Sequence, residues 1–520
     1  MIQNLRVLMV ASENDSLPGT KVGGIGDVLR DLPPALNDQG LKVDTAIPSY
    51  GFLARLPGLE PLGDIRLSFA GNLFTVAVLK KPGDCDHYIF HHPWFFREGE
   101  TVYYHDAPDR PFASDATRFA FFCACVAQAL VDKILPQPDV IHCHDWHSAY
   151  LLVLLQYGNQ YSKLRSIRTV YTIHNLTLQG IRPFTGDESS FKTWFPSLRY
   201  SIDKLIDPRY GDCVNPMRAA ILLADYVHTV SPSYAQEILQ ASDTAQGIYG
   251  GEGLEQDLRQ RYDQGRVIGI LNGCYYDADA DPNTFSKSEL AKLMQGTIRR
   301  WTAAQASLST SHWLAEKSIL RWYHKEDSGL VITSVGRLTA QKVGLLQLVL
   351  ADGHTVLDHL LSRLGPNDTV IILGSGDPSI EAFIREAVIN HPQLIFLNGY
   401  SDKLSQALYR FGHLFLMPSS FEPCGISQML AMRSGQPCLV NGVGGLKDTV
   451  KHQHTGFVFQ GETPLQQAEA LLTLFDEVLQ LYRDEPATWA AIQTAAAAER
   501  FTWQQAAQLY IDSLYQSPDA

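Results

Sequence analysis

The chain has 520 residues, more than one ordinary hydrophobic core holds, so we expect two domains. Hydrophobic residues make up 45% of it and charged residues 19%, which is typical of a soluble globular protein. The formal charge of -13 argues against nucleic acid as a partner, because an acidic surface repels polyanions.

The N-terminal run from Leu5 to Ala11 is apolar and is followed by acidic and polar residues. It predicts a first buried strand rather than a signal peptide, and we identify no apolar run long enough to span a bilayer. We therefore expect a cytoplasmic protein with no membrane partner. The eight cysteines form no C-x-x-C pair, which indicates reduced and mostly buried thiols.

A second buried strand, Val43 to Pro48, follows a helix-like segment from Asp27 to Asn37. Strand, helix and strand form a βαβ unit, whose right-handed crossover implies a parallel sheet. Glycines open this crossover and let the backbone approach a ligand, free N–H groups at the helix start favour an anion, and a lysine adds positive charge. The alternative is a turn that only closes the strand onto the helix. The segment is Lys21-Val22-Gly23-Gly24-Ile25-Gly26-Asp27.

Two further predicted strands end in histidines. The first runs through Val140-Ile141-His142-Cys143-His144-Asp145-Trp146-His147 into a helix from Ser148 to Tyr157. Its histidines and aspartate could bind a metal, but a strand-to-helix junction favours hydrogen-bonded packing, so we expect no metal. The second strand ends at Thr172-Ile173-His174-Asn175, where the histidine could be structural or functional.

The second half begins with a predicted strand from Leu330 to Gly336, followed by Arg337-Leu338-Thr339-Ala340-Gln341-Lys342. Two cations just past a strand can converge on a diphosphate, Arg337 as a bidentate donor and Lys342 as a point charge. A solvated basic loop is the commoner alternative. Further apolar runs at 370–374, 394–398, 414–417 and 437–440 alternate with helices and predict a second parallel sheet.

A polar loop follows the apolar run 414–417, with the sequence Ser420-Phe421-Glu422-Pro423-Cys424-Gly425-Ile426. Such a loop puts polar groups at the carboxyl end of a sheet beside a helix start, where phosphorylated ligands bind. Glu422 could accept hydrogen bonds from sugar or ribose hydroxyls, and N–H groups from Cys424 onward could bind hydroxyls or phosphate. A second glycine-rich helix start follows at Gly442-Val443-Gly444-Gly445-Leu446.

Five of these motifs, K-x-G-G, H-D-W-H, T-I-H-N, R-L-T-x-Q-K and F-E-P-C-G, resemble in sequence and order those of the bacterial and plant glycogen (starch) synthases. The resemblance covers nearly the whole chain. It implies an α/β fold of the GT-B type, in which two Rossmann-like parallel-sheet domains face a central cleft. The implied domains are residues 1–266 and 267–499, with a C-terminal helix at 500–520 that packs back on the first domain.

The same resemblance implies a retaining glucosyltransferase that transfers glucose from ADP-glucose to the non-reducing end of an α-1,4-glucan, without metal or other cofactor. Its catalytic residues would be His174, Arg337, Lys342 and Glu422. Its substrate-binding residues would be Lys21, Gly24, Asp27, Asp145, Asn272, Cys424, Gly425, Gly444 and Gly445. His174 would contact the transferred glucose, and Lys21 and Gly24 the nucleotide-sugar phosphates.

The chain departs from the family pattern at four positions around the donor side: Cys274, Ser420, Asn441 and Val443. Arginine is expected in place of Ser420 and Asn441, and threonine in place of Val443. A related retaining glycosyltransferase with another donor or acceptor, or a non-catalytic glucan-binding relative, therefore remains an alternative. The polar stretch from Asp281 to Thr310 is expected to be a peripheral insertion, and the oligomeric state is left open.

Overall fold

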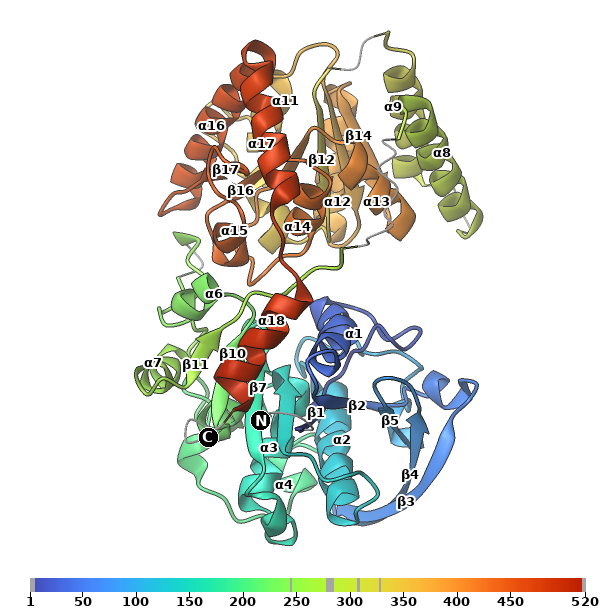
Figure 1. The fold of residues 1–520 in the computed structure, drawn as a ribbon, viewed down its shortest axis with the longest axis vertical. Helices are drawn as coiled ribbons and strands as arrows, with labels where there is room; N and C mark the ends of the chain where they lie inside the picture. The colour runs from blue at the N-terminus through green and yellow to red at the C-terminus, as the bar shows by residue number, and fades with distance from the viewer. Residues whose placement is uncertain (1–4, 244–245, 277–284, 306–308, 327–328, 517–520) are drawn as a thin grey trace. The chain divides into compact units, whose positions relative to one another are not determined.

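The computed structural model describes residues 5–243, 246–276, 285–305, 309–326 and 329–516, which form two compact units (Figure 1). The first unit comprises the described residues up to 242, residues 250–275 and the residues from 502 onward. The second comprises residues 243–249 and 276–501. Each unit is built on a large parallel sheet, so the predicted α/β class is confirmed.

The sheet of the first unit has nine strands in the order β11-β10-β7-β6-β1-β2-β5-β4-β3. All neighbours are parallel except the two pairs that β4 makes with β3 and β5. The strands are β1 (Arg6–Val10), β2 (Lys42–Pro48), β3 (Glu60–Phe69), β4 (Asn72–Lys81), β5 (His87–His91), β6 (Val140–His144), β7 (Arg168–Ile173), β10 (Tyr226–Thr229) and β11 (Val267–Gly269). A separate two-stranded ribbon pairs β8 (Arg182–Pro183) with β9 (Cys213–Val214).

The helices of the first unit are α1 (Gly24–Asn37), α2 (Ala113–Val131), α3 (Asp145–Tyr157), α4 (Phe191–Trp194), α5 (Pro216–Leu223), α6 (Pro232–Glu237), α7 (Glu255–Asp263) and α18 (Trp503–Tyr510). Helix α18 continues into a π-helical turn at Ile511–Tyr515. Figure 1 shows α18 (red) beside α1 (blue), and the two helices share one buried cluster with β1.

Helix α2 corrects the expectation that no apolar run could span a bilayer. It has 19 residues and is apolar enough to cross a membrane by length and composition. However, 78% of its most apolar window is buried inside the protein, where it packs on α3 and β3. The expectation of reduced and mostly buried thiols is confirmed, since none of the eight cysteines, all of which the structure describes, forms a disulfide and only Cys213 is partly exposed.

The predicted boundary between residues 266 and 267 lies too early. Val267–Gly269 form β11, which pairs with β10 at the edge of the first sheet, so the chain leaves the first unit only after Tyr275. The parallel ladder to β10 keeps this strand with the first core. The chain returns at Thr502, and Gly273 lies against this returning segment, because a Cβ there would come within 2.5 Å of Trp503 N.

The second unit has a six-stranded, fully parallel sheet in the order β14-β13-β12-β15-β16-β17. Its strands are β12 (Val331–Val335), β13 (Thr369–Gly374), β14 (Leu394–Asn398), β15 (Leu414–Met417), β16 (Cys438–Asn441) and β17 (Gly456–Phe459). Its helices are α8 (Lys287–Ala303), α9 (Thr310–Tyr323), α10 (Ala340–Val343), α11 (Val356–Ser362), α12 (Pro378–Asn390), α13 (Asp402–Phe411), α14 (Ser427–Arg433), α15 (Gly444–Thr449), α16 (Pro464–Asp484) and α17 (Pro486–Ala498).

Both faces of this second sheet are buried, as expected for parallel strands covered by helices. In β13, Val370 and Ile372 belong to one apolar cluster, which includes residues of α11, α12 and α16. Ile371 and Leu373 point to the other face and join a cluster with residues of α8, α9 and α13. These strands therefore need apolar side chains on both faces, which explains their continuous apolar runs.

Helix α8 is part of this second core and not a peripheral insertion. Its Leu290, Met294 and Ile298 recur every four residues and are buried against the strands of the sheet. The spacing places them on one face of the helix, while charged and polar residues cover the other. Of the predicted insertion, residues 281–284 and 306–308 lie outside the described residues.

In each sheet the strand order reverses at one pair of neighbours, β1 and β6 in the first unit and β12 and β15 in the second. The loops that follow the two strands of such a pair go to opposite faces of the sheet. A crevice therefore forms between them at the carboxyl ends of the strands, and α/β proteins commonly bind ligands there. The loops after β1 and β6 carry Lys21 and Asp145, and those after β12 and β15 carry Arg337 and Glu422. These are the sites expected from the sequence.

Candidate functional site

In the second unit, the loops after β12 and β15 meet through an ion pair between Lys342 and Glu422, 80 residues apart. Glu422 is 5% exposed, and the same carboxylate oxygen, Oε2, accepts a hydrogen bond of 3.2 Å from Ser419 Oγ. A buried carboxylate requires such partners, because burying it unpaired is costly. The pair holds the lysine amine at the carboxyl ends of two neighbouring strands.

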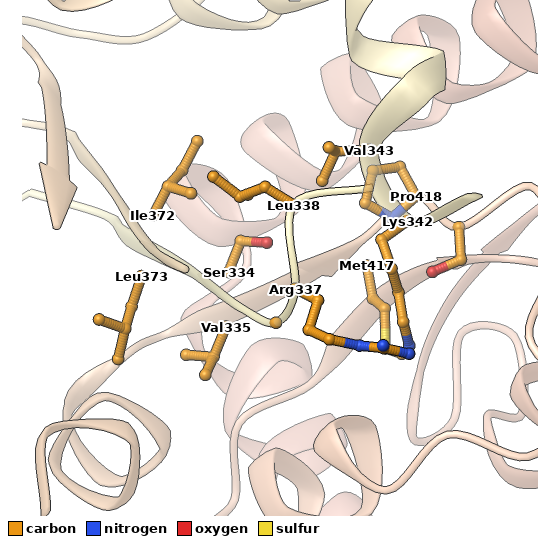
Figure 2. A pocket seen from close by; sticks show the side chains of 12 residues that line it. Ser334, Val335, Arg337, Leu338, Lys342, Val343, Ile372, Leu373, Met417 and Pro418 are labelled. Carbon is orange, nitrogen blue, oxygen red and sulfur yellow. The ribbon is translucent and has the colours of Figure 1, made fainter. Parts of the chain in front are cut away.

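Arg337 adds a second positive charge close to this ion pair. Arg337, Lys342 and Ser419 line one pocket together with Gly336, Met417 and Pro418. Figure 2 shows the side chains of Arg337 and Lys342 extending to the same side of this pocket. Arg337 is exposed and makes no side-chain hydrogen bond or ion pair with the described residues, so its guanidinium can bind an anion such as a phosphate.

The loop that carries Glu422 is held by Gln341, which precedes Lys342 in α10. Gln341 Nε2 donates to Phe421 O at 2.8 Å, and its carbonyl oxygen accepts from Ser420 N at 2.9 Å and from Ser420 Oγ at 3.2 Å. Ser420, a departure from the family pattern, therefore binds the backbone of the neighbouring loop. These bonds fix the distance between the lysine and the carboxylate.

Asn441, another departure, holds the same loop from β16. It is 1% exposed, and its Nδ2 donates to Ser419 O at 3.1 Å and to Gln467 Oε1 at 3.4 Å. Ser419 in turn donates to Glu422. Asn441 thus supports the carboxylate through one intermediate residue, and it brings no charge to the pocket.

The glycines at the start of α15 lie directly against the backbone of the loop that carries Glu422. Gly444 has φ +42°, and a Cβ on it would come within 2.0 Å of Glu422 O. Gly445 N donates to that carbonyl at 3.0 Å, and a Cβ on Gly445 would come within 2.1 Å of Cys424 O. Larger residues cannot fit at either position without displacing the Glu422 loop.

Cys424 and Gly425 lie in the turn that leads from this loop into α14. Gly425 has φ +76°, a left-handed conformation that favours glycine. Gln428 Nε2 donates to both carbonyls, to Cys424 O at 3.2 Å and to Gly425 O at 2.9 Å. The carbonyls are therefore engaged within the protein, as a defined turn requires.

In the first unit, Lys21 and Asp27 contact each other at the start of α1, with 2.7 Å between Nζ and Oδ1. Lys21 also lies 3.4 Å from Asp15, and Arg30 lies 3.1 Å from Asp27. Burial disfavours the charged amine, but the hydrogen bond and charge of Asp27, with Asp15, raise the pKa of Lys21 overall. Next to this network, a Cβ on Gly24 would meet no atom within 4 Å.

Glu13 binds the backbone just ahead of this helix start. Its buried carboxylate accepts from Val22 N at 2.8 Å and from Gly23 N at 2.5 Å through Oε2. Its Oε1 accepts from Tyr103 OH at 2.7 Å. The protein's own carboxylate thus takes two donors that the sequence assigned to a ligand. An acidic residue three positions after a buried strand was the available signal.

Asp145 sits at the β6–α3 junction with φ +53°, a conformation that aspartate tolerates better than most residues. Its Oδ1 accepts from His174 N at 2.7 Å, so it joins the ends of β6 and β7. Burial raises the pKa of Asp145 to about 7, although the N–H groups of His174 and Asn175 act in the opposite direction.

We expect the Asp145→Asn variant to gain stability relative to the wild type as pH rises. The pKa of Asp145 is about 7 in the folded protein against an ordinary value of 3.8, so its contribution to stability is complete below pH 3.8 and is lost as pH rises to 7. Asparagine has no such titration, and the stability difference should change by up to ~1.4 kcal/mol per pH unit in this window. Thermal unfolding from pH 5 to pH 8 measures it; a stability difference that does not change with pH would contradict the assignment.

His174 ends β7 and forms a hydrogen-bonded pair with His144, with 2.9 Å between His174 Nε2 and His144 Nδ1. The ring of His144 stacks on His142, at 4.3 Å between centroids. His142 lies between Tyr515 OH at 2.7 Å and Thr172 Oγ1 at 2.6 Å. The expected hydrogen-bonded packing is confirmed for His142 and His144, whereas His147 Nδ1 is buried without a hydrogen-bond partner among the described residues.

Asn272 is buried in the segment after β11, where its N–H donates to Val230 O at 3.3 Å. Its Oδ1 is buried and has no hydrogen-bond partner among the described residues.

Of the residues predicted to form the site, the structure brings three sets together, each within one unit: Lys21 with Asp27, Asp145 with His174, and Arg337, Lys342 and Glu422 with the glycines of α15.

Comparisons with known proteins cover nearly the whole chain. The family described as "Starch synthase catalytic domain" matches residues 6–260, and the family described as "Glycosyl transferases group 1" matches residues 329–477. The glycogen synthase of Streptococcus sanguinis (strain SK36) is 33% identical over 99% of this chain and 100% of its own length. The glycogen synthase of Geobacillus thermodenitrificans (strain NG80-2) is 30% identical over 97% of this chain and 96% of its own length.

Solved structures show the same similarity. The catalytic domain of starch synthase IV from Arabidopsis thaliana, bound to ADP and acarbose, matches with a TM-score of 0.72 and 27% identity, covering 99% of each chain. A sucrose-phosphate synthase from Thermosynechococcus elongatus matches with a TM-score of 0.53 and 16% identity over 98% of each chain, which is a likeness of fold alone.

Proposed function

Because this chain belongs to the family of glycogen and starch synthases, we propose that it transfers glucose from ADP-glucose to the non-reducing end of an α-1,4-glucan with retention of configuration. ADP and acarbose are bound in the similar structure of starch synthase IV from Arabidopsis thaliana. Both ligands fit a nucleotide-sugar donor and a glucan acceptor.

The observation that carries the proposal is the pair of cations in the second unit. Arg337 and Lys342 line one pocket at the reversal of strand order, and Lys342 is held there by the buried Glu422. A departing nucleoside diphosphate develops negative charge, and preorganised cations stabilise that charge in the transition state. Arg337 would bind the diphosphate through two hydrogen bonds from its planar guanidinium group. Lys342 would act as a point charge.

We propose that in the first unit His174 contacts the transferred glucose, while Asp27 and Asp145 lie near the glucose or the acceptor. Lys21 would contact the nucleotide-sugar phosphates. Burial lowers the pKa of His174 to about 3, so the imidazole is neutral near pH 7 and acts by hydrogen bonding. Displacement would then occur on the same face of the sugar through an oxocarbenium-like state. The described residues contain no group of three His, Cys, Asp or Glu side chains able to hold a metal ion.

A related glycosyltransferase with another nucleotide sugar is the second candidate. It is favoured by the neutral side chains of Ser420 and Asn441, which bind the Glu422 loop and add no cation to the pocket. A lower positive charge beside the pocket would change how the donor is bound.

The deciding experiment offers the purified protein a glucan primer with ADP-, UDP- or GDP-glucose in turn, each with and without EDTA. We expect glucosyl transfer from ADP-glucose at an unchanged rate in EDTA, because Arg337 and Lys342 supply the positive charge. Transfer only from UDP- or GDP-glucose would favour the second candidate, and transfer from none of them would indicate a non-catalytic relative. Reactions without primer are the control.

A further inference from the structure

The hydrogen bond between His144 and His174 has only one proton to share. His144 is 0% exposed, and His174 Nε2 lies 2.9 Å from its Nδ1. Burial holds the pKa of His144 well below its usual range and that of His174 at about 3. Both rings are therefore neutral near pH 7, and each carries one N–H. Either His144 Nδ1 or His174 Nε2 is the donor.

The other nitrogen of His144 distinguishes these two arrangements. His144 Nε2 is buried and has no hydrogen-bond partner among the described residues. If His174 were the donor, the proton of His144 would sit on this Nε2 as a buried N–H without an acceptor. Orphaned buried N–H groups are rarer in proteins than buried acceptors that lack a donor. The arrangement with the proton on His144 Nδ1 leaves Nε2 as an acceptor without a donor, which is the less unfavourable of the two cases.

The donor role of His144 determines the tautomer of its neighbour. Since His174 Nε2 must then be the acceptor, the single proton of His174 lies on Nδ1. His174 Nδ1 makes no hydrogen bond with the described residues. His174 is half-buried and this nitrogen is not fully buried, so it remains accessible. We propose that His144 is a positioning residue that holds His174 as a neutral N–H donor, directed from Nδ1 to an oxygen of the sugar substrate.

His144 can impose this tautomer because it is itself held in place. Its ring stacks on His142, and His142 is fixed on both sides by Tyr515 OH and Thr172 Oγ1. Tyr515 belongs to the C-terminal segment that returns to the first unit. The π-helical turn at Ile511–Tyr515 therefore supports the orientation of the residue that follows β7. The identity of the sugar rests on the proposed function, whereas the tautomer does not.

The test is a nitrogen NMR spectrum of protein labelled with ¹⁵N-histidine, in which the His174 signals are assigned by their loss in His174→Gln. We expect the wild type to show a protonated Nδ1 and a bare Nε2 for His174 at pH 7. A proton on Nε2 would overturn the proposal. Because no substrate is present, the result stands whether or not the protein transfers glucose, so failure of the proposed function is seen separately in the donor assay.

Two variants separate positioning from packing. His144→Asn can keep an N–H near the position of Nδ1, whereas His144→Leu fills the site without a donor. We expect His144→Leu to lose the Nδ1–H tautomer of His174 and to lower kcat by about 10²-fold, since orientation of a contact group can be worth that much. His144→Asn should restore both the tautomer and most of kcat. Loss of kcat with the tautomer unchanged, or an unchanged kcat in His144→Leu, would overturn the proposal. Exposed His454→Asn is the control.

Discussion

The Lys342→Ala variant is expected to transfer glucose with kcat/KM lowered by at least ~10²-fold, the scale of losing one preorganised contact to a developing negative charge. Lys342 is the cation that Glu422 holds in the pocket it shares with Arg337. Alanine removes the charge and also leaves the buried Glu422 carboxylate with Ser419 as its remaining side-chain donor. Steady-state kinetics with the accepted donor measure the effect. Exposed Lys403→Ala, on α13 of the same unit, should stay within twofold of the wild type.

A double variant distinguishes the two consequences of losing this lysine. Lys342→Met should lower the melting temperature, because breaking a buried ion pair leaves an uncompensated charge and costs about 3–5 kcal/mol. Adding Glu422→Gln removes that charge and should restore the melting temperature without restoring kcat/KM. If Lys342→Met alone keeps a wild-type rate, or the double variant recovers activity, Lys342 does not act on the leaving group.

The Gly444→Ala variant is expected to lower kcat/KM by a similar ~10²-fold, because a displacement of about 1 Å in a catalytic group can cost that much. The added Cβ would lie within 2.0 Å of Glu422 O, and φ at this position is +42°, where side chains are strained. Glu422 and its partner Lys342 must then shift. The loss should appear in kinetics, while the fold, measured by circular dichroism, is retained.

Gly296→Ala is the matched control for this variant. Gly296 lies within α8 of the same unit, and an added Cβ there would meet nothing closer than Arg300 Nη1 at 3.8 Å. Alanine in a helix interior is favoured over glycine by about 1 kcal/mol, so this variant should be fully active and slightly more stable. Equal loss of activity in both variants would mean that the effect at Gly444 is not due to the Glu422 loop.

Two of the residues that depart from the family pattern acquire a role from these contacts. Ser420 and Asn441 stand where the family pattern has arginine, and the structure shows them bonded to the backbone around Glu422. Their hydrogen-bond partners are Gln341 and Ser419. The sequence located both partners near the site, but it did not show that they bind Ser420 and Asn441. These two side chains therefore help to hold the loop that carries Glu422, whose carboxylate pairs with Lys342.

Sequence alone was sufficient for features that depend on neighbouring residues. Buried strands such as Thr369–Gly374 are apolar because helices cover both sheet faces, and the alternation with helices predicts parallel sheets. The polar loops after β1, β6, β7, β12 and β15 were located in the same way. The boundary at 266/267 and the insertion at Asp281 to Thr310 were wrong, because short strands and half-buried helices show little contrast in local composition.

What the sequence by itself determined is therefore the two parallel sheets and the loops that carry Lys21, Asp145, Arg337 and Glu422. Only the tertiary structure decided which of these side chains meet, and which are already occupied by other residues of the chain. Glu13 takes the N–H groups of Val22 and Gly23, and Lys342 pairs with Glu422 across 80 residues. The reason is physical: periodicity reports the contacts of one element with its core, whereas contacts between loops depend on strand order, which local spacing does not encode.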